Sequence, residues 1–364
     1  MPTYGIWQEK DLALDELASE VDRDALLEAQ LETVATHNAE VAAMVNIFAD
    51  EVSTPQLAVR TGGGAARLQP LDENGRPKPI KGQGQYIVGF PLYKAGVAEG
   101  FNFWTREQMT VRDFADSLDL MLRADVTWVR DQMLSPLFYS GAGFSYADDR
   151  IGESFTVYGL ANGDTTQYDK TSGGGVDSHY TAEADAISTG NNLFPTIYEE
   201  LIEHPGNAGR VVAFVPPAIA NTIALLPGYA PVEQNTIRIV PALDDATIDP
   251  LVSPGLDLPL SRTMRHVGML NSTYIVTWQN LPAGYIVHVA VDAAVKPLGL
   301  RQYSQARLRG LRNEGEPMSR FPYQQNNWVR ALGFGARNRI AAHVYYYGTS
   351  DTYTAPTNYP FPLA

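Results

Sequence analysis

Apolar residues recur at alternating steps of four and three near the start of the chain, which is the spacing of one face of an α-helix. The run is broken only at Asn38, and Asp22 or Asp24 can cap its amino end. From there to Val52 the helix would be about 40 Å long at 1.5 Å per residue. Its apolar stripe can pack on its own domain or on a neighbouring subunit, and both interpretations stay open. The stripe consists of Leu27, Leu31, Val34, Val41, Val45, Phe48 and Val52.

A second helix is predicted over residues 110–134. Thr110 and Asp113 resemble a capping box in which Asp replaces the usual Glu. An apolar period of 3.6 residues follows and continues to Ser135 and Pro136, where the proline is expected to end the helix. The predicted length is about 35 Å. The periodic residues are Val111, Phe114, Leu118, Met121, Leu122, Val129 and Met133.

Between the two helices the pattern indicates a long β-hairpin. Short alternating runs at 57–59 and 86–88 flank a segment rich in Gly and Pro, and the sequence Asp-Glu-Asn-Gly at 72–75 is typical of a hairpin tip. Legs that rise ~3.3 Å per residue would reach roughly 60 Å, whereas a compact body is about 50 Å across. Because an isolated two-stranded ribbon is only marginally stable in water, it needs another surface, most simply the next copy of the chain. The alternative is a surface loop with no partner.

The rest of the chain reads as mixed helix and strand, which makes the fold class α+β. Residues 140–192 are rich in Gly, Ser, Thr and Asp, and they favour loop and hairpin structure, or an insertion, around a strand at 154–158. Helices are predicted at 194–203 and 217–226. Strands are predicted at 211–215, 236–240, 273–278 and 285–291, and within 335–347.

Composition then narrows the class of protein. A length of 364 residues allows roughly two to two and a half domains. The absence of cysteine excludes disulfides, thiolate zinc sites and cysteine nucleophiles, and it suits a reducing cytoplasm. No signal peptide is readable at the amino end. The long charge-free stretch from Val211 to Val232 contains four prolines, so we interpret it as strand, turn and short helix and not as a membrane span.

Charge is unevenly distributed along the chain. Residues 1–51 hold twelve acids and two bases, whereas residues 301–339 hold eight arginines and two acids, and the hairpin is also basic. We interpret this as complementarity between subunits, although the arginines could instead bind nucleic acid together with Tyr303, Phe321, Tyr323 and Trp328. The net charge of −14 argues against a general affinity for nucleic acid. The candidate intersubunit contacts are Arg60, Arg67, Arg76, Lys78, Lys81, Arg301, Arg307, Arg309, Arg312 and Arg320.

Catalytic and metal-binding patterns are not found. No two of the six histidines have the i, i+4 spacing of a helical zinc site, and neither G-x-S-x-G nor a P-loop occurs. Acid groups beside many aromatic residues leave a carbohydrate-active enzyme as a minor alternative. The acids that carry it are Asp244, Asp245 and Asp249, and Glu199, Glu200 and Glu203. We predict no catalytic residue, no cofactor and no metal.

Three segments, taken with the order of elements, resemble the major capsid proteins of tailed bacteriophages, which have the Hong Kong 97 fold. They are Arg-Val-Val-Ala-Phe-Val-Pro-Pro at 210–217, Leu-Pro-Ala-Gly-Tyr-Ile-Val-His at 281–288, and Leu-Gly-Phe-Gly-Ala-Arg-Asn-Arg at 332–339, which leads into Ile-Ala-Ala-His-Val at 340–344. With the element order, the resemblance covers nearly the whole chain.

The resemblance implies a subunit of an icosahedral virion shell that assembles with itself into hexamers and pentamers, first in the host cytoplasm. Only about 50 residues precede the hairpin, so any scaffolding function would come from another protein; portal and decoration proteins are further expected partners, and DNA is contacted nonspecifically at most. A nanocompartment (encapsulin-like) shell is the alternative. The implied domains are an N-terminal arm (1–54), an extended loop (55–105), a peripheral domain with the spine helix (106–192 and 301–348), an axial domain (193–300) and a C-terminal tail (349–364).

Overall fold

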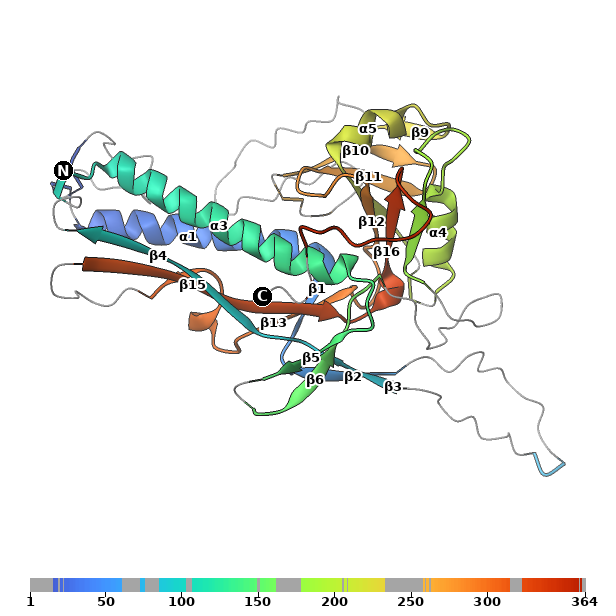
Figure 1. Cartoon of the computed structure of the whole chain (residues 1–364), viewed down its shortest axis with the longest axis horizontal. Coiled ribbons are helices and arrows are strands. Elements are labelled where there is room, and N and C mark those ends of the chain that lie inside the picture. Colours follow the sequence, from blue (N-terminus) through green and yellow to red (C-terminus); the bar gives the residue numbers. More distant parts are fainter. Residues whose placement is uncertain are drawn as a thin grey trace.

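The computed structural model describes most of the chain, and the fold is built from the segments it describes (Figure 1). The strand predicted at 236–240 and most of the two hairpin legs lie outside these residues. The described residues are 16–18, 20–21, 23–60, 73–75, 85–102, 107–148, 151–161, 178–204, 206–207, 209–232, 258, 260–261, 263–314, 323–359 and 361.

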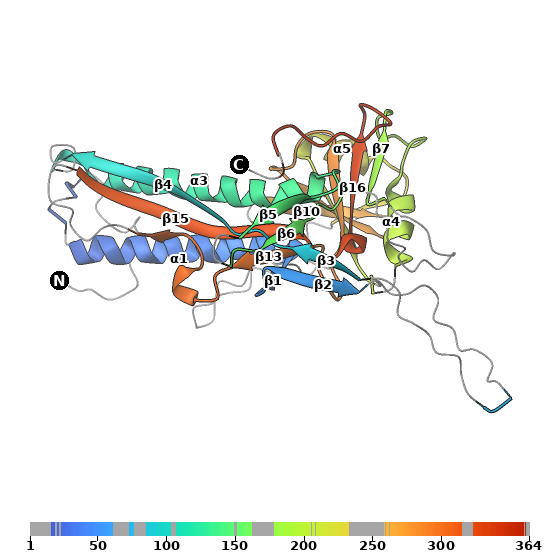
Figure 2. The ribbon, with the colours of Figure 1, turned by 60° about the horizontal axis from the view of Figure 1, so that its bottom comes forward.

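Two long helices lie side by side and form the spine of the molecule (Figures 1 and 2). They are α1 (Arg23–Phe48) and α3 (Val111–Phe138), close to the two predicted helices. The first was predicted to reach Val52, but the chain leaves the helix after Phe48 and forms strand β1 (Ala49–Val52), which pairs in parallel with β13 (Leu298–Gln302). Backbone hydrogen bonds to a neighbouring strand therefore replace the last helical turn.

The ends of α3 test the sequence rules in opposite ways. The capping box is present, since the Thr110 hydroxyl accepts from the Asp113 amide and the Asp113 carboxylate accepts from the Thr110 amide. The predicted stop at Ser135 and Pro136 is wrong, because the helix continues to Phe138. A proline in the last turn removes only one helical hydrogen bond. The Pro136 carbonyl accepts from the Leu160 amide at 2.7 Å, and the fully buried side chains of this turn hold it in the core.

One sheet has five strands and runs along the spine. Its path is β1, β13, β15 (Tyr323–Ala336) and β14 (Arg312–Asn313), and β4 (Tyr93–Asn102) pairs with β15 over ten consecutive residues. The sequence analysis missed both β4 and the first part of β15. These strands carry Gly, Gln and Asn where alternating apolar residues would have marked them. A 3₁₀ turn, η3 (Ala306–Leu308), lies between β13 and β14.

The other large sheet has seven strands, in the order β7, β16, β12, β8, β11, β10, β9. The predicted strands at 211–215, 273–278 and 285–291 are confirmed as its centre, and α4 (Phe194–Ile202) and α5 (Pro217–Ala224) confirm the two predicted helices beside it. Strand β8 lies between β11 and β12, so the link at 279–284 crosses over it. The strands are β7 (Tyr180–Glu183), β8 (Val211–Val215), β9 (Tyr229–Pro231), β10 (Met264–Leu270), β11 (Thr273–Trp278), β12 (Tyr285–Ala290) and β16 (Ala342–Tyr347).

The sheet pairings differ from the predicted domain boundaries in two places. Strands β7 and β16 fall within the predicted peripheral domain, yet they pair with each other and, through β12, join the sheet of residues 193–300. The short η4 (Arg339–Ala341) separates β15 in one sheet from β16 in the other. The chain therefore passes between the sheets more often than a division at residues 193 and 300 assumes. The remaining boundaries stay predictions.

The base of the predicted hairpin is confirmed. Strand β2 (Gln56–Arg60) pairs antiparallel with β3 (Gln85–Gly89), and a turn at 73–75 has Gly75 in the left-handed region, with φ of 71°. Figures 1 and 2 show this turn well clear of both large sheets. The base packs against a second hairpin, β5 (Phe144–Ala147) and β6 (Ser154–Val157), so closely that a Cβ at Gly89 would lie 2.1 Å from the Phe155 ring. The hairpin is thus anchored only at its base among the described residues.

The main core joins the spine to the seven-stranded sheet. Phe48, at the end of α1, stacks on Trp278 with ring centroids 5.4 Å apart, and it contacts Phe214 at 4.8 Å. All three side chains are fully buried. Among the described residues, no helix is long and apolar enough to cross a membrane.

His288, on β12 in this core, makes stability depend on pH. Burial lowers its pKa to about 3, and neither ring nitrogen has a hydrogen-bond partner among the described residues. The unfolded chain binds this proton below about pH 6.5 and the folded chain does not, so stability is present above that pH and falls as the pH drops towards 3. We expect His288→Leu to remove up to about 1.4 kcal/mol per pH unit of this dependence. Denaturant unfolding of both proteins between pH 4 and 8 measures it, and equal slopes would contradict the assignment.

Candidate functional site

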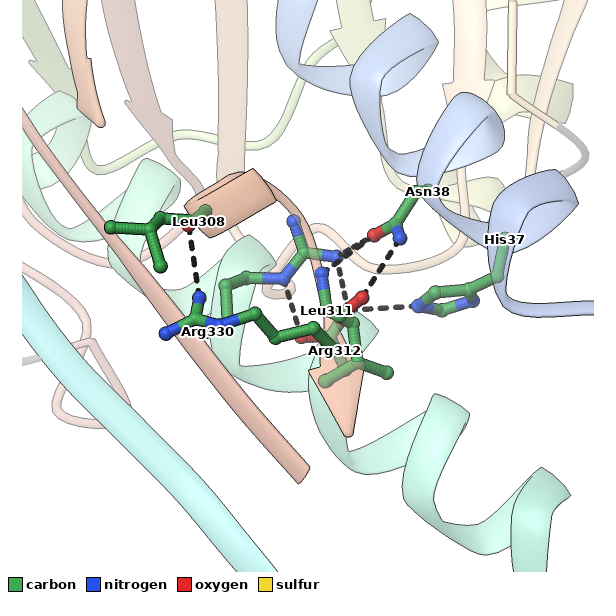
Figure 3. Close-up of polar contacts among 7 residues, drawn as sticks. His37, Asn38, Leu308, Leu311, Arg312 and Arg330 are labelled. Carbon is green, nitrogen blue, oxygen red and sulfur yellow. Dashed lines mark hydrogen bonds and ion pairs between the residues drawn. The ribbon is translucent and has the colours of Figure 1, made fainter. Parts of the chain in front are cut away.

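A buried polar cluster joins the two spine helices to the five-stranded sheet. It consists of His37 and Asn38 on α1, Asp125 on α3, Arg330 on β15 and the backbone of Leu311 (Figure 3). Arg330 donates from Nε and Nη2 to the two carboxylate oxygens of Asp125, at 2.6 and 2.7 Å. His37 Nε2 lies 2.8 Å from the same carboxylate. Three elements that are far apart in the sequence are therefore held at one point.

Asn38 extends the cluster to the loop before β14. Its amide oxygen accepts from Arg330 Nη2 and from the Leu311 amide, both at 2.7 Å, and its nitrogen donates to the Leu311 carbonyl at 3.0 Å. Asn38 is the residue that interrupts the apolar stripe of the first predicted helix. The interruption thus marks a hydrogen-bonded position in the interior, and nearby Arg312 fixes the same loop by donating to the Leu308 carbonyl at 2.9 Å (Figure 3).

The cluster is deeply buried, which decides its energetic role. Asp125, Arg330 and His37 are only 7%, 6% and 8% exposed. An ion pair taken out of water gains little net stability, but removal of one partner leaves an uncompensated charge and is strongly destabilising. The cluster therefore specifies how α1, α3 and β15 align, while the apolar core around it supplies most of the stability.

Arg301, a candidate intersubunit contact, is part of a second buried pair. Its guanidinium lies 2.6 Å from Asp148, with side-chain exposures of 8% and 4%, and it donates to the Phe90 carbonyl at 2.9 Å. It fixes β13 against the hairpin of β5 and β6. This placement corrects the candidate assignment, because the side chain is enclosed by its own subunit.

The other candidate contacts fall into three groups. Arg307 is exposed on η3. Arg309 pairs with Glu51 at 2.6 Å and Arg312 pairs with Glu314 at 2.5 Å, both partly exposed. Arg60 lies on β2, but its side chain is outside the described set, as are Arg67, Arg76, Lys78, Lys81 and Arg320.

The acidic and basic ends of the chain meet partly within the subunit. Besides the pair of Glu51 and Arg309, Asp50 lies 3.4 Å from Arg337 and accepts from the Lys296 amide. The interpretation of these charges as intersubunit pairs is therefore wrong for Arg309 and Arg337. Strand β1, which carries both acids, is drawn next to β13 by backbone pairing that sequence spacing did not reveal.

The alternative that the arginine-rich segment binds nucleic acid loses its central residues. Trp328 is only 2% exposed, and Arg330 and Arg339 are buried. A buried indole cannot stack on a base, and a guanidinium paired inside the core cannot reach a phosphate. The side chains of Phe321 and Tyr323 are outside the described set.

The carbohydrate alternative gains no support from the geometry. Glu199, Glu200 and Glu203 lie on or at the end of α4, and Glu200 Oε2 is 3.6 Å from His343 Nδ1, a contact that joins helix and sheet. Asp244, Asp245 and Asp249 lie outside the described residues. Within the described part of the chain, no group of three or more His, Asp or Glu residues could hold a metal ion.

Comparison with known proteins identifies the fold. No family model and no curated protein matches the chain. A chain in a solved structure of Mycobacterium phage Patience aligns with a TM-score of 0.65 and 20% identity, over 100% of this chain and 98% of that chain. The chain therefore has the phage capsid fold, which confirms the α+β class and the resemblance seen in the sequence.

Two further structures align more weakly. The mature capsid of bacteriophage PhiM1 gives a TM-score of 0.45 at 9% identity, over 84% of this chain and 86% of that chain. The holo-SrpI encapsulin complex from Synechococcus elongatus PCC 7942 gives 0.42 at 11%, over 86% and 89%. At these scores neither likeness supports an argument.

We expect Arg330→Met to lower the free energy of unfolding by about 3–5 kcal/mol, because it leaves the Asp125 carboxylate buried without its main partner. The matched control is Arg123→Met on the same helix, which breaks an exposed pair with Asp119, with side-chain exposures of 76% and 54%. Exposed pairs contribute about 0–1 kcal/mol. Denaturant unfolding measures both, and similar losses would show that the buried cluster has no special role.

Gly310 offers a second test of the cluster. Its φ is 74°, and a Cβ there would lie 2.8 Å from the Asn38 side chain. Gly348 has the same φ of 74° with nothing within 4 Å, so Gly348→Ala measures the backbone cost alone, about 1–2 kcal/mol. We expect Gly310→Ala to lose more than that in thermal or denaturant unfolding. Equal losses would mean that Asn38 moves aside without cost.

Proposed function

We propose that the chain is the structural subunit of an icosahedral viral capsid. The observation that carries the proposal is the full-length alignment with the Mycobacterium phage Patience chain, which leaves almost none of either chain unmatched. The role assigns no reaction to the protein, and it needs no cofactor. The subunit's function is to bury surface against other copies of itself.

The structure provides the two properties that such a subunit needs. The polar cluster and the shared aromatic core hold spine and sheets in one arrangement, so that each copy presents the same surfaces. The hairpin that begins at β2 and β3 is anchored only at its base among the described residues. Heterologous contacts of this kind, repeated around closed symmetry, give rings and shells. Hexamers and pentamers in a virion are the expected form, assembled in the host cytoplasm.

The intersubunit contacts are proposed to be the basic residues that the subunit does not enclose. Arg307 is exposed, whereas Arg309 and Arg312 already have carboxylate partners in their own chain and would contribute less. Exposed pairs contribute about 0–1 kcal/mol each, so they would fix register more than affinity. The remaining members of the proposed set are Arg60, Arg67, Arg76, Lys78, Lys81 and Arg320.

Scaffolding, portal and decoration proteins are proposed as further partners. Packaged DNA is expected to be contacted nonspecifically at most, since the net charge is −14 and the aromatic residue best placed for stacking, Trp328, is buried. A nanocompartment shell would share the subunit architecture. Its particles would enclose an enzyme in place of DNA.

Electron microscopy of the purified chain, alone or coexpressed with a scaffolding protein, should show rings or closed particles. The reason is that the alignment covers the whole chain, so no part needed for closure is missing from the comparison. A monomer that persists at high protein concentration in both preparations would contradict the proposal.

Deletion of residues 62–84 should give a folded subunit that does not assemble. The deleted part of the ribbon contributes little to the core, because the buried residues at its base, Val88 and Phe90, are retained. The unfolding midpoint should stay close to that of the intact chain, while particles disappear from sedimentation profiles. Loss of folding would show that the ribbon serves its own domain, and normal particles would show that it is not an assembly element.

A further inference from the structure

Helix α1 has two apolar faces, and the subunit uses only one of them. The inner face, which includes Val34, Val41, Val45 and Phe48, is buried in the core and against α3. The outer face carries small or apolar residues at steps of four, four, four and three, and all are exposed. They are Leu27, Leu31, Ala35, Ala39 and Ala42.

The two leucines are the unexpected part of this face. They belong to the stripe that predicted the helix, but in the structure Leu27 is 50% and Leu31 is 60% exposed. A single exposed leucine is ordinary on a protein surface. Here two leucines one turn apart continue into three alanines along about 22 Å of helix. Leucines at one end and alanines at the other form a face on which a second helix can pack closely.

Acidic residues flank the leucine end. An open groove is lined by Asp24, Leu27, Glu28, Leu31 and Glu32. After Arg23, the helix contains no lysine or arginine. One carboxylate oxygen of Glu32 is inaccessible to solvent and has no hydrogen-bond partner among the described residues. The groove therefore offers apolar contact in its floor and acceptors for positive charge at its rim.

The charge selects the occupant. A second α1 would place acids against acids, which is unfavourable for helices packed side by side. We infer that the outer face of α1 is a docking site for a basic amphipathic helix of a partner protein. Its leucine-like residues at i, i+4 and i+7 would contact Leu27 and Leu31, and its lysine or arginine side chains would pair with Glu28 and Glu32. This is the helix-in-groove mode of recognition.

The probe is a fluorescent helical peptide with leucines at i, i+4 and i+7 flanked by lysines, and its control has glutamates in place of the lysines. Anisotropy is measured against the unassembled full chain. We expect the lysine peptide to bind, with an affinity that falls as salt rises, and the glutamate peptide not to bind. Equal binding of the two peptides, or no binding of the lysine peptide, would overturn the inference.

Matched variants separate this face from the general acidity of the chain. We expect Leu27→Gln/Leu31→Gln and Glu28→Lys/Glu32→Lys each to weaken binding at least about tenfold. Their controls lie on α3: Leu120→Gln, at a leucine that is 61% exposed, and Asp116→Lys/Asp119→Lys, with the same change in net charge. The controls should leave binding within about twofold, and unfolding midpoints should be unchanged for all four. Equal effects at α1 and α3 would contradict the site.

A second copy of the chain is the competing occupant. Ala35→Cys introduces the only cysteine of the chain on the outer face of α1. Under oxidising conditions the free chain should stay monomeric in non-reducing gels, and the lysine peptide should protect the thiol from alkylation. Rapid disulfide-linked dimers would assign the face to self-contact and overturn the inference. Peptide binding does not require particles, so this test and the test of assembly can fail separately.

Discussion

The carboxylate of Asp125 is the constraint on which the arrangement of the subunit depends. A charge that is almost inaccessible to water must be matched by donors, and here they come from Arg330 on β15 and His37 on α1. These partners lie 205 and 88 residues away in sequence. A register shift of any one element would leave a buried charge unmatched. The apolar core can tolerate sliding more easily than this contact can.

With the inner faces fixed, the subunit leaves defined surfaces for other molecules. The outer face of α1, the hairpin beyond β2 and β3, and the exposed Arg307 all lie away from the core. Their chemistry differs, since α1 is acidic and the hairpin is basic. A subunit that must make the same contacts in many copies needs a rigid interior and complementary exteriors, and this chain separates the two roles by element.

Several elements could be predicted from sequence because their signals are local. The α3 cap depends on two residues three apart, and strands β8 and β11 are continuous apolar runs. Strands β4 and β15 escaped prediction because they bury polar and glycine-rich sequence by pairing with each other. The arginines show the same limit. Arg301 and Arg330 were counted as part of a charged surface, and only their carboxylate partners reveal them as interior residues.

The sequence by itself determined the period of both spine helices, the hairpin turn at Gly75, the charge of each segment and the absence of thiol chemistry. These properties follow from neighbouring residues, whose geometry is fixed by bond rotation and short-range hydrogen bonds. Only the tertiary structure decided which face of α1 is buried, that β8 lies between β11 and β12, and that Asn38, Asp125 and Arg330 meet. Such contacts depend on chain segments that are far apart in sequence, and spacing along the chain carries no record of them.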